Sequence, residues 1–300
     1  MGTTDGPIAG VSIDPIPYLP FMDGPAPAGP AAFRWRLGVR PLDLADWVEL
    51  GPDADAAIEA KARLMAEHPG TVFAVLDDRV ADEGREVADV LVDHLRRRWP
   101  ERYGDAILDP ALHPLDAAAR LVPEDLVLLV ERNGRLVFGG GSVCFPNRWD
   151  LRSKLGLTMA GVHAPVDRLN EQLEAPIDGF FERLTPERSF WRLGWGVLDT
   201  ADWYTPVDGT GARRPPRPAL GEYVLRVERE TLRRFPQTGC VLFTIRTYVT
   251  ALLAPAASPA VAARLSAALS SLPDDVRGYK DLATVADQLA ELVRAVPDDR

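Results

Sequence analysis

Two segments in the first half of the chain carry apolar residues at the three- and four-residue spacing of a helix. The first is 53–68 and the second is 85–99. A proline follows each segment at once, which is typical of a helix end. The apolar side of the second segment consists of Val87, Val90, Leu91, His94 and Leu95. We therefore predict two amphipathic helices here, with a shorter one at 116–121.

From residue 125 onward the pattern becomes that of strands. Segments 125–131 and 135–143 flank Asn133-Gly134, the strongest short-range signal for a β-hairpin. The run of three glycines from Gly139 to Gly141 indicates a bulge or a close approach of another backbone or ligand. Further strands are predicted at 33–39, 190–198, 223–234 and 240–250, of which the last two form a second hairpin.

Helical patterns return between and after these strands. A short helix is expected at 151–155, a long one at 165–184 with a break near Pro176, and further helices from Ser258. Strands and helices do not alternate regularly, so a doubly wound parallel sheet is excluded, and we predict an α+β fold with a mainly antiparallel sheet and flanking helices. The domains expected are an extended Pro/Gly-rich arm at 1–31, a single domain at 32–285 and a polar tail at 286–300.

Charge and composition narrow the classes of partner. The net charge is −10 and the pI is about 5.0, so a nucleic acid or an anionic membrane is not expected as a partner, whereas a cationic substrate is compatible. We find no apolar run long enough to span a membrane and no signal peptide, which predicts a cytoplasmic protein. Few lysines beside much arginine, alanine and proline are typical of a GC-rich bacterial genome.

Motifs for the common cofactors and nucleophiles are absent from the sequence. There is no Gly-x-Gly-x-x-Gly after a strand, no P-loop and no Gly-x-Ser-x-Gly. Two cysteines cannot supply the four thiolates of an ordinary iron–sulfur cluster. If the protein performs redox chemistry, we therefore expect its electrons to come from another protein.

Four histidines are candidate ligands or catalytic groups. His68 and His113 lie at a helix end and in a turn, where a structural role is expected. His94 lies on the apolar side of the helix at 85–99, which suits either core packing or a ligand role. His163 stands between apolar neighbours just before Pro165, so that a rigid turn could present one ring nitrogen into a pocket. Cys144 is an alternative thiolate ligand, although a buried structural cysteine is the simpler interpretation.

The second predicted hairpin could form a polar lattice on one face. If Arg234 faces Cys240, the opposed pairs are Glu228–Arg246, Glu230–Thr244 and Arg226–Tyr248. Such a face is either solvated or a ligand pocket, in which arginines hold a carboxylate and a glutamate holds an ammonium. A shift of one residue in this register would place the two sets on opposite faces.

Strand 190–198 adds an aromatic side to the same region. Trp191, Leu193 and Trp195 alternate onto one face of that strand and Arg192 onto the other. Aromatic rings there could line a cofactor or attract a cation, although core packing is the simpler explanation for each of them.

Several stretches together resemble the haem-dependent oxidative N-demethylase family. The resemblance covers about residues 17–282 in matching order. The stretches are RLGVRPLD at 36–43, GSVCFPNRW at 141–149, KLG at 154–156, VHAPV at 162–166, LRVERETLRR at 225–234 and LFTIRTY at 242–248.

The resemblance implies a haem b held in a PAS-like fold. It implies O₂ activation, oxidation of an amine's methyl group to formaldehyde, and electrons from a separate reductase or ferredoxin-type donor that carries NAD(P)H, flavin and iron–sulfur centres. The histidine of the family's Ile-His-x-Pro-Val pattern falls on His163, which becomes the expected iron ligand, with His94 as the alternative. Residues expected to line the cofactor are Arg192, Arg226, Arg246, Tyr248 and Cys144, and those expected to place the amine are Glu228, Glu230 and Trp195.

This chain departs from the family pattern at positions that bear on the substrate. Family members tend to have Asn where Gly194 stands, Gln where Glu230 stands, and Pro-Gly where residues 167–168 read Asp-Arg. The departures leave open a different amine, including a larger biosynthetic one. Two other functions remain open at this point: a haem sensor or carrier without turnover, and a haem-free interaction module.

Overall fold

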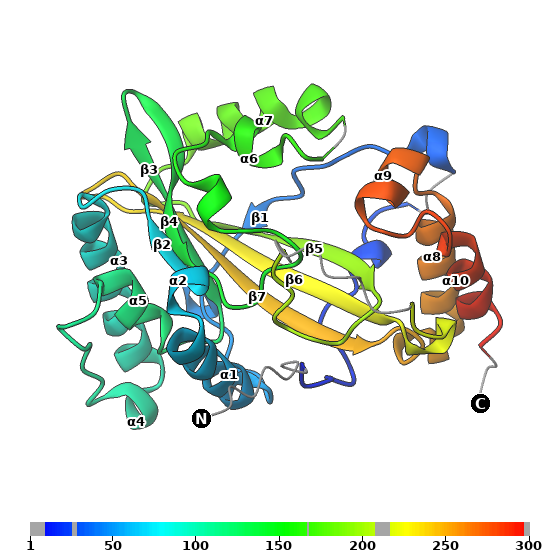
Figure 1. Cartoon of the computed structure of the whole chain (residues 1–300), viewed down its shortest axis with the longest axis horizontal. Coiled ribbons are helices and arrows are strands. Elements are labelled where there is room, and N and C mark those ends of the chain that lie inside the picture. Colours follow the sequence, from blue (N-terminus) through cyan, green and yellow to red (C-terminus); the bar gives the residue numbers. More distant parts are fainter. Residues whose placement is uncertain (1–9, 26–28, 167, 208–216, 297–300) are drawn as a thin grey trace.

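The computed structural model describes residues 10–25, 29–166, 168–207 and 217–296, and these residues form one antiparallel sheet with helices around it (Figure 1). The strand order is β1-β5-β6-β7-β3-β4-β2. This arrangement confirms the predicted α+β class, whereas the PAS-like character stays a prediction. The strands are β1 Arg40–Pro41, β2 Phe73–Val75, β3 Asp125–Arg132, β4 Arg135–Ser142, β5 Phe190–Leu198, β6 Val224–Arg234 and β7 Val241–Ala251.

The helices gather in three groups around the sheet. In Figure 1, α1 to α5 lie at one end, α8 to α10 at the other, and α6 with α7 above the strands. None of the described helices is both long and apolar enough to cross a membrane. The helices are α1 Ala54–Glu67, α2 Pro69–Val72, α3 Val80–Arg98, α4 Pro100–Tyr103, α5 Pro114–Ala119, α6 Met159–His163, α7 Leu169–Arg183, α8 Pro259–Ser270, α9 Asp274–Tyr279 and α10 Ala286–Arg294.

Alternation along β5, β6 and β7 gives the sheet two different faces. We call one the Glu228 face, which carries Arg192, Gly194, Gly196, Arg226, Glu228, Glu230, Ile245 and Thr247. We call the other the Arg229 face, which carries Trp191, Leu193, Trp195, Val227, Arg229, Arg233, Thr244, Arg246 and Tyr248. Each face meets its own helices, so the sheet separates two chemical environments.

Apolar side chains attach the helices to these faces. Helix α7 packs Leu173 and Phe180 on Leu232, which lies on the Glu228 face. Helix α3 packs against β3 in a separate cluster, and α8 with α10 packs against Val227 on the Arg229 face. The N-terminal arm joins this last cluster through Phe21, as expected for an arm that lies along the body.

Several local predictions need correction. Residues 33–39 form no strand, and only Arg40 and Pro41 pair with β5. Helix α7 begins at Leu169 rather than at 165, because the separate helix α6 ends at His163, and it continues through Pro176 because its apolar face is buried. Residues 286–294, expected in a polar tail, form α10 and bury Leu289. Asp167 and much of the predicted loop at 205–220 lie outside the described residues.

The glycine run in β4 is explained by a bulge and by close backbone contact. The pairing of β3 with β4 shifts by one residue beside Gly139. A Cβ on Gly140 would lie 2.7 Å from the carbonyl oxygen of Ala74 in β2. The close approach expected from the sequence is therefore to a neighbouring strand.

Gly140→Ala should destabilise the fold because the added methyl group would push β2 away from β4. We expect a loss of about 1–3 kcal/mol in the free energy of unfolding, measured by urea denaturation. Gly221→Ala is the matched control, since no atom lies within 4 Å of a Cβ at that position. Equal stability of the two variants would contradict this account.

Candidate functional site

His163 is held at the end of a short, well-anchored helix. Thr158 caps α6, because its hydroxyl accepts a hydrogen bond from the backbone N–H of Gly161. Lys154 donates from its ammonium to the carbonyl of Val162 at 3.1 Å, and the Asn170 amide donates to the carbonyl of Ala160 at 2.8 Å. These contacts tie α6 to the segment before it and to α7, so the position of His163 is defined by three elements.

The imidazole of His163 is half-buried and neutral. Its Nδ1 is buried and has no hydrogen-bond partner among the described residues. Burial lowers the pKa of His163 to about 4, with further lowering by Arg192 and Lys154, and the Met159 backbone partly opposes this shift. The ring therefore stays unprotonated at physiological pH, which is the form that binds a metal.

The register of the second hairpin differs by one residue from the prediction. Arg234 faces Val241, not Cys240, and Glu228 consequently faces Thr247. The reason lies in the turn, in which Phe235 donates to the carbonyl of Cys240 and Gly239 takes a positive φ of 74°, so that Phe235 takes the place opposite Cys240 that was predicted for Arg234. The predicted pairing of Glu228 with Arg246 is wrong, because alternate residues change sides with such a shift.

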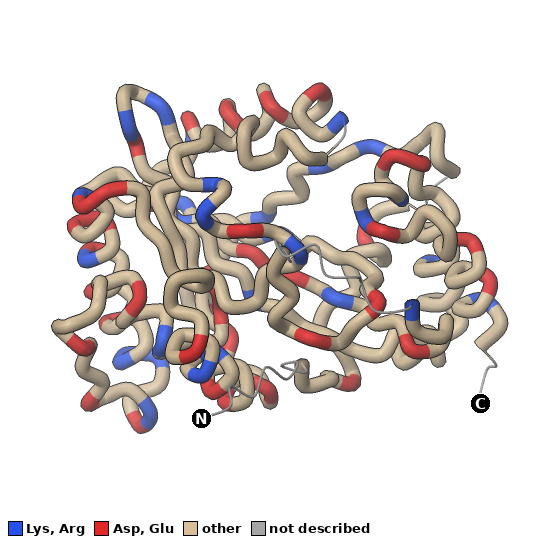
Figure 2. Tube along the Cα trace, in the orientation of Figure 1, with Lys and Arg blue, Asp and Glu red and all other residues tan. Residues whose placement is uncertain are grey.

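The Glu228 face carries two adjacent ion pairs. Arg192 Nε lies 2.9 Å from Glu230, and Arg226 Nε donates to Glu228 at 2.8 Å. Gly194 faces Glu228 across the strands, and a Cβ on it would lie only 3.1 Å from Glu230 Oε1. The missing side chain thus leaves room for the two carboxylates. Charges of both signs along the central strands are visible in Figure 2.

Glu230 is suited to exchange a proton near neutral pH. It is 8% exposed, and burial raises its pKa to about 7, helped by repulsion from Glu228 and opposed by Arg192. Its partner Arg192 also acts on His163 electrostatically, which places His163, Arg192 and Glu230 in one neighbourhood. A buried carboxyl with such a pKa can hold a proton or carry a charge according to what binds beside it.

Two residues that the sequence analysis missed complete this neighbourhood. The ammonium of Lys280 donates to the carbonyl of Trp195 at 3.0 Å, on β5. Burial lowers the pKa of Lys280, and Glu228 opposes the shift; burial raises the pKa of Tyr279, and Glu228 adds to it. No local sequence pattern marks the loop after α9 as part of a site. The only feature that could have drawn attention to Lys280 is that lysine is rare in this chain.

Arg246 and Tyr248 lie on the Arg229 face and are engaged there. Arg246 is completely buried and pairs with the buried carboxylate of Asp53. The hydroxyl of Tyr248 donates to Glu49 at 2.5 Å. The structure therefore does not bring these two predicted cofactor residues together with His163, and it gives them a structural setting.

Trp195 and Cys144 are also placed apart from the two glutamates. The indole of Trp195 packs on Phe21 of the N-terminal arm, with 5.5 Å between ring centroids, on the Arg229 face. Cys144 is fully buried, and burial raises the pKa of its thiol, as does Asp125. A protonated, enclosed thiol is not the thiolate that iron requires. Its placement favours the structural interpretation of this cysteine.

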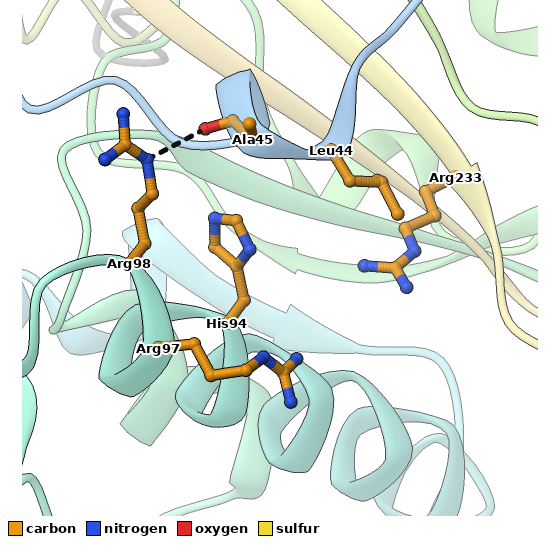
Figure 3. Close-up of a pocket in the computed structure, with 6 residues that line it drawn as sticks. All are labelled: Leu44, Ala45, His94, Arg97, Arg98 and Arg233. Atoms are coloured by element: carbon orange, nitrogen blue, oxygen red, sulfur yellow. Dashed lines mark hydrogen bonds between the residues drawn. The ribbon is translucent and has the colours of Figure 1, made fainter.

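His94 occupies a different environment from that of His163. Its ring packs on Trp47 and Trp99, with centroid distances of 5.2 and 6.0 Å. Burial lowers its pKa to about 4, and Arg233, Arg97 and Arg98 add to this. Figure 3 shows these arginines around the ring at a small pocket. Its setting is cationic and aromatic, without a carboxylate among the residues that line the pocket.

No group of three or more His, Cys, Asp or Glu side chains in the described part of the chain could hold a bare metal ion. A comparison with protein-family models matches residues 38–290 to the family described as haem-dependent oxidative N-demethylase, alpha subunit-like. The match covers most of the chain and includes every residue of the site described above.

Proposed function

Because the chain belongs to the haem-dependent oxidative N-demethylase, alpha subunit-like family, we propose that it binds haem b through His163 and oxidises an amine beside its nitrogen. The family description gives haem dependence and oxidative chemistry. The observation that carries the assignment to His163 is the place of its neutral imidazole: it is influenced by Arg192, which pairs with Glu230 on the Glu228 face, whereas His94 lies among arginines and tryptophans.

The residues around His163 fit a haem group. A haem iron needs a ligand atom from the protein, which the neutral imidazole of His163 would supply. Arg192, whose charge lowers the pKa of His163, could donate from its guanidinium to a propionate, since arginine binds carboxylates through paired N–H groups. Gly194 and Gly196 add no side chains on the same face, where the carboxylates of Glu228 and Glu230 and the ammonium of Lys280 lie instead.

The two glutamates of the Glu228 face are proposed to place the amine. When bound, haem would supply the O₂-activating iron that no side chain provides. Glu228 and Glu230 hold their carboxylates over Gly194, and an ammonium bound there would find a charge-assisted partner. Glu230, whose pKa is about 7, can also accept the proton that an ammonium substrate must lose before the carbon beside its nitrogen is oxidised.

Electrons are proposed to come from a separate reductase or ferredoxin-type donor with NAD(P)H, flavin and iron–sulfur centres. The sequence lacks the motifs that bind nicotinamide, and its two cysteines are both buried as free thiols. The word subunit in the family description is compatible with such a partner.

The decisive experiment measures oxygen consumption by the haem-loaded protein with a surrogate reductase and a panel of secondary and tertiary amines. We expect amine-dependent consumption and release of one aldehyde per amine oxidised. A Soret band that shifts with amine but no turnover with any of them would favour the haem sensor instead. Absence of any Soret band after reconstitution would overturn the proposal.

Glu230→Gln should remove the pH dependence of amine binding. Raising the pH through about 7 ionises Glu230, so the affinity of the native protein for an alkylammonium ion should rise with pH. The gain should be roughly tenfold, as expected for a charge-assisted hydrogen bond. Glu230→Gln should show a flat profile between pH 6 and 8 in a spectral titration.

Glu131→Gln, at an exposed position in β3, is the matched control and should keep the native profile. If the profile of Glu230→Gln kept its slope, a different group would govern the binding.

A further inference from the structure

The pocket beside His94 lies where the C-terminal end of α3 meets β6. It has a volume of about 290 Å³, close to the smallest volumes typical of small-molecule sites. Figure 3 shows the side chains that line it, which are Leu44, Ala45, His94, Arg97, Arg98 and Arg233. Arg233 belongs to the Arg229 face, so the pocket is on the side of the sheet away from Glu228 and Glu230.

Positive charge in this pocket is poorly compensated. Arg97 has one distant ion pair, 3.9 Å from the exposed Asp93. Arg98 donates only to the carbonyl of Ala45, at 3.4 Å, and neither Arg98 nor Arg233 makes an ion pair among the described residues. Burial and Arg97 lower the pKa of Arg233, while Glu86 opposes this. Three guanidinium groups thus gather in a chain whose net charge is −10.

Aromatic rings hold two of these arginines in place. The guanidinium of Arg233 lies 4.5 Å from the centroid of the Trp47 ring, and that of Arg98 lies 5.3 Å from that of Trp99. His94 stands between them in Figure 3, and its Nε2 is buried without a partner in the described structure. Because the guanidinium groups are already held in place, less conformational entropy is lost when an anion binds to them, and the pocket is preorganised for an anion.

We propose that this pocket binds a phosphate group, either as free phosphate or as part of a small phosphorylated molecule. Guanidinium groups match phosphate oxygens with pairs of parallel N–H donors, and three of them meet the charge of a phosphate dianion. The bound anion relieves the repulsion between Arg97 and Arg233 and gives His94 an acceptor. The pocket contains neither His163 nor any residue of the Glu228 face, so phosphate binding here does not depend on the proposed function.

Calorimetric titration of the full chain with inorganic phosphate, and separately with ADP, tests the proposal. We expect saturable binding at one site, and the C2-proton NMR signal of His94 should report a pKa that rises from about 4 toward the ordinary value of about 6.5. Equal affinities identify free phosphate as the ligand chemistry, whereas binding of ADP at least tenfold tighter identifies a phosphorylated molecule.

Substitutions of single arginines distinguish binding at this pocket from nonspecific electrostatic attraction of the anion to the protein surface. Arg233→Gln and Arg97→Gln should each weaken binding at least tenfold, while Arg233→Lys should retain part of it. Arg85→Gln changes an exposed arginine of the same helix and should bind like the native protein. Circular dichroism establishes that each variant is folded, and Arg97→Gln, at an exposed position, keeps the test valid if Arg233→Gln unfolds.

Three results would overturn the proposal. These are the absence of saturable binding at 10 mM ligand, binding that is unchanged in both glutamine variants, and arginine-dependent binding of polyglutamate without any binding of phosphate. The last result would identify a docking surface for an acidic protein.

Discussion

His163→Ala is expected to lose haem almost completely after reconstitution. The substitution removes the neutral imidazole whose pKa Arg192 helps to lower, and with it the side chain that is proposed to hold the iron. The measurement is the Soret absorbance per protein after removal of free haem. Added imidazole should restore part of the band if the cavity persists.

His94→Ala is the matched control, because His94 has a similarly low pKa and a similarly unpartnered nitrogen but lies among arginines and tryptophans. It should keep the Soret band. Retention of haem by His163→Ala together with its loss from His94→Ala would reverse the ligand assignment.

Asp53→Ala is expected to destabilise the fold by about 3–5 kcal/mol. Asp53 and Arg246 are both almost completely inaccessible, and removal of the carboxylate leaves a buried guanidinium without its counter-ion. Urea unfolding followed by tryptophan fluorescence measures the loss. Asp82→Ala breaks an exposed pair with Arg85 and should change stability by less than about 1 kcal/mol.

A substitution of Arg246 can distinguish a structural role of this residue from a role in binding the cofactor. Arg246→Met should lower stability, yet the folded protein at low temperature should bind haem with native affinity, because Arg246 lies on the face opposite Glu228. If the fully folded variant bound haem tenfold more weakly than the native protein, Arg246 would have to be a cofactor-binding residue.

Much of the fold and part of the site could be predicted from local patterns. Strand β5 has the predicted bounds, and Arg192 does point away from Trp191, whose ring lies 5.4 Å from the Arg229 guanidinium. Arg192, Arg226, Glu228 and Glu230 were all predicted, and they share one face. Lys280 could not be predicted, because it reaches the site from a loop 85 residues away from Trp195.

The sequence by itself determined most of the long helices and strands and which side chains alternate within each strand. These properties depend on neighbours a few residues apart, on proline stops and on the Asn133-Gly134 turn. Only the tertiary structure decided the register of β6 with β7, because the pairing of Phe235 with Cys240 shifts the register by one residue and places Arg246 and Tyr248 on the face opposite Glu228. It also decided the pKa of Glu230 and of His163, since burial by distant segments sets the local solvation of both groups.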